Sequence, residues 1–157
     1  MILQSKTPIS DFISIIAGSV YIIPLILYYV TQNSYNFDIF LGTTGTTIIS
    51  ELIKKYLIGR ASQRPDGAKN CDMLCMDGNQ SGYPGMPSSH ASTVTFFAVM
   101  YWYKTDSYII RSLLIIFILS VLIARFVKHC HTINQLIGGV LLGLILSIIW
   151  NCVSSSA

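Results

Sequence analysis

The histidine at position 90 lies where a phosphate-binding helix start is predicted. Residues 87–90 read Pro-Ser-Ser-His and precede a long apolar run, a pattern typical of a helix capped by a hydroxyl. The unpaired N–H groups and positive dipole end of such a helix bind phosphate oxygens. His90, in the first turn, could then protonate a leaving oxygen. The alternative is that a serine only caps the helix and that His90 is an interfacial polar residue.

A second histidine is paired with an amide. His131 and Gln135 are four residues apart and therefore share one face at the start of a predicted helix. Gln135 could hold one ring nitrogen of His131 and leave the other free to attack phosphorus. A histidine nucleophile splits one difficult displacement into two easier steps. The alternative is that His129 and His131 are only interfacial polar residues.

Several cations accompany these histidines. Arg64 and Arg125 each lie beside a histidine-bearing segment, and the planar guanidinium binds phosphate in a bidentate way. Cations at a membrane surface also set orientation or attract anionic lipid, and this explanation applies first to Lys6, Lys54 and Lys69. Three segments that converge on one membrane face nevertheless favour a phosphate site.

Membrane helices are the elements that must position these residues. Of the 157 residues, 52% are hydrophobic and 11% are charged, against about 25% charged in an ordinary soluble domain. The segments 12–37, 78–103 and 129–157 contain no Asp, Glu, Lys or Arg. This pattern excludes a secreted disulfide scaffold and a disordered tail, and a net charge of +3 is too small for a nucleic-acid binder. The sequence predicts an integral membrane protein.

We predict an all-α bundle of about five transmembrane helices, because a bilayer needs about 20 apolar residues per helix. The predicted spans are 12–30, 39–57, 89–103, 108–127 and 133–153. One domain would cover residues 1–157, with an N-terminal helix in 1–36 and the active site at one membrane interface. The segment 58–86 is rich in Gly, Pro and charge, and long loops of this kind are usually functional or disordered.

Two of the four cysteines, Cys71 and Cys75, lie in this loop and could form a disulfide in an oxidising lumen. A zinc site that uses these two with His129 and His131 is conceivable, but the spacing is not that of a usual structural site. Such a site would also use the candidate nucleophile, so we expect no metal and no other cofactor.

Two features of the sequence disagree about the side of the membrane that the loop faces. Five spans place most cations on the side of the loop, which the positive-inside rule assigns to the cytosol. Asn79-Gln80-Ser81 is a glycosylation sequon, which is usable only on the lumenal side.

Together, the segments resemble the signature of the type 2 phosphatidic acid phosphatase superfamily, Lys-x6-Arg-Pro, Pro-Ser-Gly-His and Ser-Arg-x5-His-x3-Asp. The resemblance covers residues 54–140, and its parts read Arg64-Pro65 with Lys55 upstream, Pro87-Ser88-Ser89-His90 and Ala124-Arg125-x5-His131-x3-Gln135. Eight residues, where the signature has six, separate Lys55 from Arg64. Ala124, Ser89 and Gln135 stand where the signature has Ser, Gly and Asp.

The dolichyldiphosphatase branch is similar in two of these departures, with Gly-Met-Pro-Ser-Ser-His and His-Thr-x2-Gln followed by Gly-Gly. Residues 85–90 match the first pattern, His131, Thr132 and Gln135 match the second, and Gly138-Gly139 follows. The departures therefore narrow the assignment to this branch.

The resemblance implies a metal-independent membrane phosphohydrolase that cleaves a polyprenyl diphosphate to the monophosphate and inorganic phosphate. His131 would form a phosphohistidine, His90 would be the acid, and Gln135 would orient His131. The substrate phosphate would be held by Lys55, Arg64, Ser88, Ser89 and Arg125. The resemblance to the branch also favours the endoplasmic reticulum with a lumenal site.

Two other functions stay open at this point. A phosphatidate phosphatase, or a general lipid phosphate monoester phosphatase, could use the same motifs, because they do not encode the shape of the pocket. A non-catalytic membrane protein could retain the fold, as the lengthened first motif and Ala124 suggest. In every case the expected partners are a lipid and the bilayer, with no nucleic acid.

Overall fold

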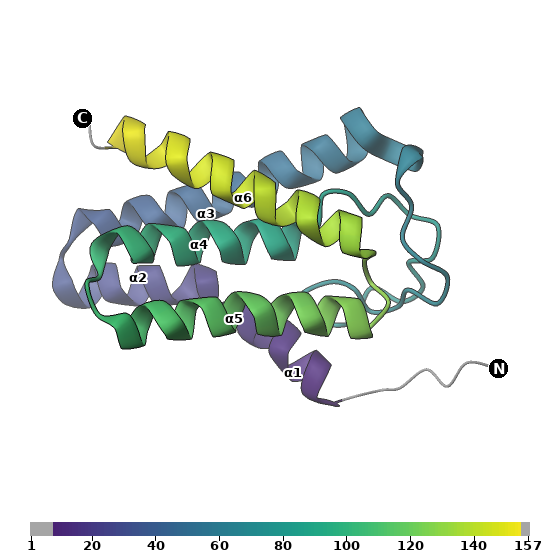
Figure 1. The fold of residues 1–157 in the computed structure, drawn as a ribbon, viewed down its shortest axis with the longest axis horizontal. Helices are drawn as coiled ribbons and strands as arrows, with labels where there is room; N and C mark the ends of the chain where they lie inside the picture. The colour runs from purple at the N-terminus through teal and green to yellow at the C-terminus, as the bar shows by residue number, and fades with distance from the viewer. Residues whose placement is uncertain (1–7, 155–157) are drawn as a thin grey trace.

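Six α-helices account for most of residues 8–154, the part of the chain that the computed structural model describes (Figure 1). They are α1 (Pro8–Ala17), α2 (Ser19–Thr31), α3 (Ser34–Leu52), α4 (Ser89–Lys104), α5 (Tyr108–Val127) and α6 (Ile133–Ser154). A π-helix (Ile53–Ile58) and a 3-10 turn (Gly59–Ala61) extend α3. The architecture is the predicted helical membrane bundle.

Fewer helices than expected are long and apolar enough to cross a membrane alone. Among the described residues, α5 and α6 meet that requirement, and the bent pair α1–α2 meets it as one broken span. The predicted spans 39–57 and 89–103 correspond to α3 and α4, whose facing sides are rich in hydroxyl groups. These sides pack against each other instead of lipid, as the bonds Ser50–Ser92 (2.6 Å) and Thr47–Thr93 (3.0 Å) show.

The predicted first span, 12–30, is wrong as a single helix. It consists of α1 and α2, which meet at Gly18 with a bend of 41°. Pro24 lies inside α2 and does not cause the break. A Cβ at Gly18 would lie 2.5 Å from the sulfur of Met73. Gly18 therefore leaves room for a side chain of the long loop.

Helix α4 lies in the middle of the bundle and approaches α6 very closely (Figure 1). A Cβ at Gly139 of α6 would lie 2.5 Å from the carbonyl oxygen of Ser88 and 2.8 Å from the Cβ of Ala91. Small residues permit this close approach of backbones, and the resulting van der Waals packing is one of the forces that associate helices in lipid. The glycines of α6 thus position the first turn of α4.

The long loop packs at the end of the bundle where α4 begins and α5 ends (Figure 1). Its predicted bounds, 58–86, start slightly early because helical turns continue to Ala61. Two isolated antiparallel bridges, Gln63–Pro84 and Lys69–Asn79, fold the loop back on itself. The loop is therefore an ordered cover over that end.

We expect Gly139→Ala to lower the free energy of unfolding by about 1–3 kcal/mol, because the added methyl must push α4 away from α6. The matched change Gly45→Ala, in α3, has nothing within 4 Å of the new Cβ and should be neutral or stabilising by up to about 1 kcal/mol. Thermal unfolding in detergent measures both. Equal effects of the two substitutions would contradict the close contact of α4 with α6.

Candidate active site

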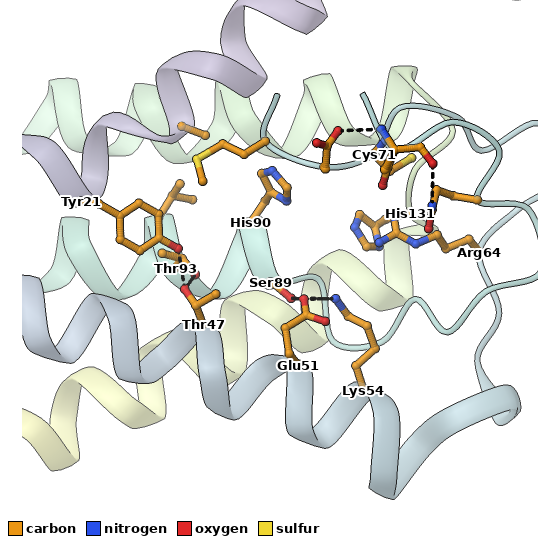
Figure 2. Close-up of a pocket in the computed structure, with 16 residues that line it drawn as sticks. Tyr21, Thr47, Glu51, Lys54, Arg64, Cys71, Ser89, His90, Thr93 and His131 are labelled. Atoms are coloured by element: carbon orange, nitrogen blue, oxygen red, sulfur yellow. Dashed lines mark hydrogen bonds and ion pairs between the residues drawn. The ribbon is translucent and has the colours of Figure 1, made fainter. Parts of the chain in front are cut away.

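A cavity of about 360 Å³ opens beneath the loop, between α2, α3 and α4 (Figure 2). Its lining includes two histidines, two cations, a carboxylate and a hydroxyl. These are His90, His131, Lys54, Arg64, Glu51 and Ser89. Residues from three separate segments of the sequence therefore meet at one site.

Hydrogen bonds fix the orientation of Gln135. Its amide nitrogen donates to the carbonyl oxygen of Gln63 at 2.8 Å and to the hydroxyl of Ser62 at 3.1 Å. Because a carbonyl oxygen only accepts hydrogen bonds, the amide must turn its NH₂ group toward the loop. The amide oxygen of Gln135 therefore faces His131.

This orientation determines which nitrogen of His131 is free. The Oε1 of Gln135 lies 3.3 Å from Nδ1 of His131 and also accepts from the backbone N–H of Thr132 at 3.1 Å. An acceptor opposite Nδ1 requires that Nδ1 carry the proton. The lone pair is then on Nε2, which is the atom available to attack an electrophile.

The environment of His131 favours its neutral form. Burial, together with the guanidinium of Arg64, holds the pKa of His131 well below its ordinary value. A neutral imidazole keeps its nucleophilic lone pair at neutral pH. The side chain is therefore ready to attack without prior deprotonation.

Two other nitrogens of the lining have no partner among the described residues. Nε2 of His90 and Nε of Arg64 are both buried. Buried polar atoms are rarely left without a hydrogen bond, and unexplained ones occur at functional sites. Both atoms are donors or acceptors of the kind that a phosphate group would satisfy.

A family model described as the PAP2 superfamily matches residues 35–156. The chain belongs to the PAP2 superfamily. Searches of curated proteins and of solved structures found no match. Membership of this superfamily implies phosphatase activity on lipid phosphates and supports a membrane phosphohydrolase.

The lysine that lines the cavity is the neighbour of the one that the motif spacing suggested. Lys55 is exposed and lies over the ring of Tyr56, 5.1 Å from its centroid. Lys54 is 6% exposed and lines the cavity instead. Both lie in the π-helix, whose wider turn rotates side chains relative to α-helical register. Spacing alone could not distinguish two adjacent lysines.

Two further residues expected at the phosphate lie behind the lining. Ser88 is fully buried and accepts from the backbone N–H of Ala91 at 3.4 Å, as a helix cap. Arg125 is fully buried and donates to the hydroxyl of Ser14 at 2.8 Å and to the carbonyl oxygen of Cys71. In this structure both support the site, whereas Arg64, Ser89, His90 and His131 line it directly.

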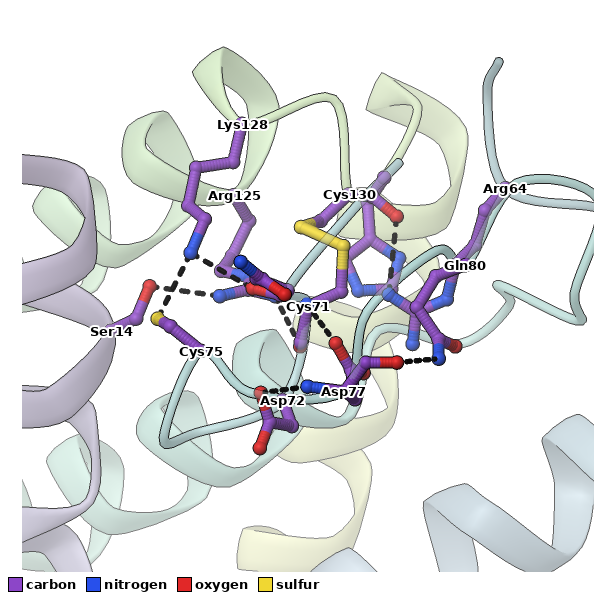
Figure 3. The surroundings of a disulfide bond; sticks show 12 residues. Ser14, Arg64, Cys71, Asp72, Cys75, Asp77, Gln80, Arg125, Lys128 and Cys130 are labelled. Atoms are coloured by element: carbon purple, nitrogen blue, oxygen red, sulfur yellow. Dashed lines mark hydrogen bonds between the residues drawn. A yellow bond between two sulfur atoms is a disulfide. The ribbon is translucent and has the colours of Figure 1, made fainter. Parts of the chain in front are cut away.

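The expected disulfide Cys71–Cys75 is wrong. Cys71 pairs with Cys130, with 5.5 Å between the two Cα atoms (Figure 3). The thiol of Cys75 instead accepts from the ammonium of Lys128 at 3.0 Å. This disulfide ties the loop to the residue that precedes His131, and it removes Cys71 from the alternative zinc site.

Glu51 is a charged member of the lining that the motifs did not indicate. Its carboxylate lies 2.6 Å from the ammonium of Lys54 and accepts from the hydroxyl of Ser89 at 2.5 Å. In the sequence it is an isolated acid inside a weakly apolar segment. The one available signal was that such acids are costly in a membrane and are usually functional.

We expect Gln135→Glu to lower the free energy of unfolding and, at low pH, to lower the activity as well. A carboxylate cannot donate to the loop oxygens of Ser62 and Gln63, which should cost about 1–3 kcal/mol of stability. Its charge would also raise the pKa of His131, so the acid limb of kcat/KM moves to higher pH. In the wild type that limb should lie below pH 6.5, the ordinary pKa of histidine, because protonation of His131 removes the lone pair.

Thermal unfolding and the pH dependence of lipid phosphate hydrolysis measure these two effects. Asn134→Asp is the matched control, because it adds the same charge at an exposed neighbouring position. A Gln135→Glu variant with the stability and pH profile of the wild type would contradict the assigned orientation of the amide.

We expect a covalent link between the loop and the segment after α5. Trypsin should release residues 70–104, which hold Cys71 and Cys75, and residues 129–157, which hold Cys130 and Cys152. Mass spectrometry without reductant should find these two peptides joined, also in a variant that combines Cys75→Ser with Cys152→Ser. Separate peptides, with a bond inside 70–104, would favour Cys71–Cys75 instead.

The disulfide should also stabilise the fold. In the chain-entropy model, closing a loop of 59 residues stabilises by about 4 kcal/mol, so the Cys130→Ser variant should unfold at a markedly lower temperature.

Proposed function

We propose that the protein hydrolyses a polyprenyl diphosphate to the monophosphate and inorganic phosphate, without a metal ion, through a phosphohistidine on His131. The observation that carries this proposal is the hydrogen bonding of Gln135, which leaves Nε2 of His131 free within a cavity that also holds Lys54 and Arg64. A motif similar to that of the dolichyldiphosphatases supports the choice of substrate.

The reaction has two displacements at phosphorus. Nε2 of His131 attacks the terminal phosphorus, the bond to the bridging oxygen breaks, and His90 gives a proton to the departing lipid phosphate. A water molecule then attacks the phosphohistidine, His90 accepts a proton from that water, and inorganic phosphate leaves with His131 regenerated. Lys54 and Arg64 stabilise the negative charge that develops on the phosphoryl oxygens.

An apolar groove beside the cavity suits the chain of a lipid substrate. The groove, of about 490 Å³, lies between α2, α4 and α5 and is lined mainly by apolar side chains. Phe97 lines the groove, and Val94, one turn earlier on α4, lines the cavity. A phosphate in the cavity and a hydrocarbon chain in the groove would thus be adjacent.

One observation favours a second candidate, hydrolysis of a glycerolipid phosphate monoester such as phosphatidate. One side of the cavity is lined by Tyr21, Thr47 and Thr93, whose hydroxyls form a hydrogen-bonded cluster (Figure 2). Ester and hydroxyl oxygens of a glycerolipid could bond to this cluster, whereas a polyprenyl chain has no such groups.

We propose that the loop faces an oxidising compartment, such as the lumen of the endoplasmic reticulum. The Cys71–Cys130 disulfide supports this side, because such bonds persist in oxidising environments. The sequon at Asn79 lies in the same loop.

We expect purified protein in detergent to release phosphate from a polyprenyl diphosphate with EDTA present. His131→Asn should lower kcat by at least about a thousandfold, because the nucleophile is lost. His129→Asn, an exposed neighbour, is the matched control and should retain activity. Tyr21→Phe should lower activity on phosphatidate and leave the polyprenyl substrate unaffected.

Other results of this experiment would contradict a part of the proposal. Loss of activity with EDTA would exclude the metal-free mechanism, and activity in His131→Asn would exclude the nucleophile. Faster release from phosphatidate would favour the second candidate. No release from any lipid phosphate would favour a protein that retains the fold without catalysis.

A further inference from the structure

A carboxylate lies inside a cavity built to bind an anion. Glu51, Lys54 and Ser89 form a closed triangle of hydrogen bonds at one wall of the cavity (Figure 2). The ammonium of Lys54 donates to Glu51 at 2.6 Å and to Ser89 at 2.7 Å. The hydroxyl of Ser89 lies 2.5 Å from the same oxygen of Glu51.

The chemistry of the three groups assigns every proton in this triangle. An ammonium has three donors and no acceptor, and a carboxylate only accepts. The proton of Ser89 must therefore point to Glu51, and Ser89 must accept from Lys54. The third N–H of Lys54 has no acceptor within residues 8–154, and Lys54 lines the cavity. Glu51 and Ser89 thus determine where that N–H points.

Glu51 also contributes charge at the surface of the cavity. Its side chain is 56% exposed, whereas that of Lys54 is 7% exposed. An entering phosphate therefore meets the carboxylate as well as the ammonium beneath it. The carboxylate weakens the attraction of Lys54 for any phosphate, including the product.

The other two acids that line the cavity have different partners. Asp77 accepts from the backbone N–H of Cys71 at 2.6 Å, and Asp72 accepts from that of Met76 at 2.6 Å. Both hold turns of the loop. Among the described residues of the lining, Glu51 is the acid that is bonded to a phosphate-binding candidate.

We infer, on the basis of the proposed phosphatase activity, that Glu51 is a positioning residue that aims Lys54 at the phosphate and offsets its charge so that product phosphate leaves. Removing the charge of Glu51 while keeping its hydrogen bonds should then tighten phosphate binding and slow turnover. The Ser89 hydroxyl, which stands where the superfamily signature has glycine, completes the arrangement by joining Glu51 to the first turn of α4.

The test is the affinity of the purified full-length protein for inorganic phosphate, measured by calorimetry in detergent. Glu51→Gln retains an oxygen that accepts from Lys54 and Ser89, and it should bind phosphate about threefold to tenfold more tightly. With lipid substrate, both KM and kcat should decrease. Asp38→Asn removes the same charge from the opposite end of α3 and should leave phosphate affinity unchanged.

A purely structural role for Glu51 predicts the opposite result, with weaker phosphate binding and a lower unfolding temperature in Glu51→Gln. Unchanged or weaker binding by a folded Glu51→Gln protein would overturn the inference, as would a wild type that binds no phosphate. Lys54→Met should weaken phosphate binding. If the wild type binds phosphate but releases none from any lipid, the proposed function fails, while the comparison of affinities still tests the role of Glu51.

Discussion

The hydrogen bonds of one residue, Gln135, connect the long loop, His131 and the start of α4. Its amide nitrogen binds the loop through Gln63, its amide oxygen faces His131, and its backbone carbonyl accepts from Ser88 at 3.1 Å. A Cβ at Gly85 would lie 2.6 Å from this amide, so the loop also packs tightly around it. Segments of the three motifs are far apart in sequence and meet around this single residue. An aspartate at this position would offer only acceptors to the loop carbonyls, which explains why an amide suits this chain.

The features that could be predicted from the sequence are those that depend on local periodicity and composition. The membrane class follows from long uncharged blocks, and the facing of His131 and Gln135 follows from their spacing on a helix. Other features depend on contacts between distant segments. The close contact of Gly18 with Met73 of the loop joins distant segments, and the choice of Lys54 over Lys55 reflects a local change of helical turn that no spacing rule records. The same applies to the partner of Cys71, which lies 59 residues away.

Helices α1 and α2 lie outside the region matched by the family model, which begins at residue 35. They nevertheless contribute to the site. Tyr21 of α2 lines the cavity, and Ser14 of α1 binds the buried guanidinium of Arg125. A fully buried cation needs polar partners, and α1 supplies one of them from outside the matched region. This side of the cavity is therefore formed in part by residues that precede the matched region.

The disulfide places a condition on the order in which the protein matures. Cys71 precedes α4, and Cys130 follows α5. The bond can therefore close only after both helices have been synthesised and have come together as a hairpin. Until then, the loop has no covalent tie to the segment that carries His131. The oxidised bond consequently marks chains in which the α4–α5 hairpin has been completed, and reduced chains include those still being assembled in the membrane.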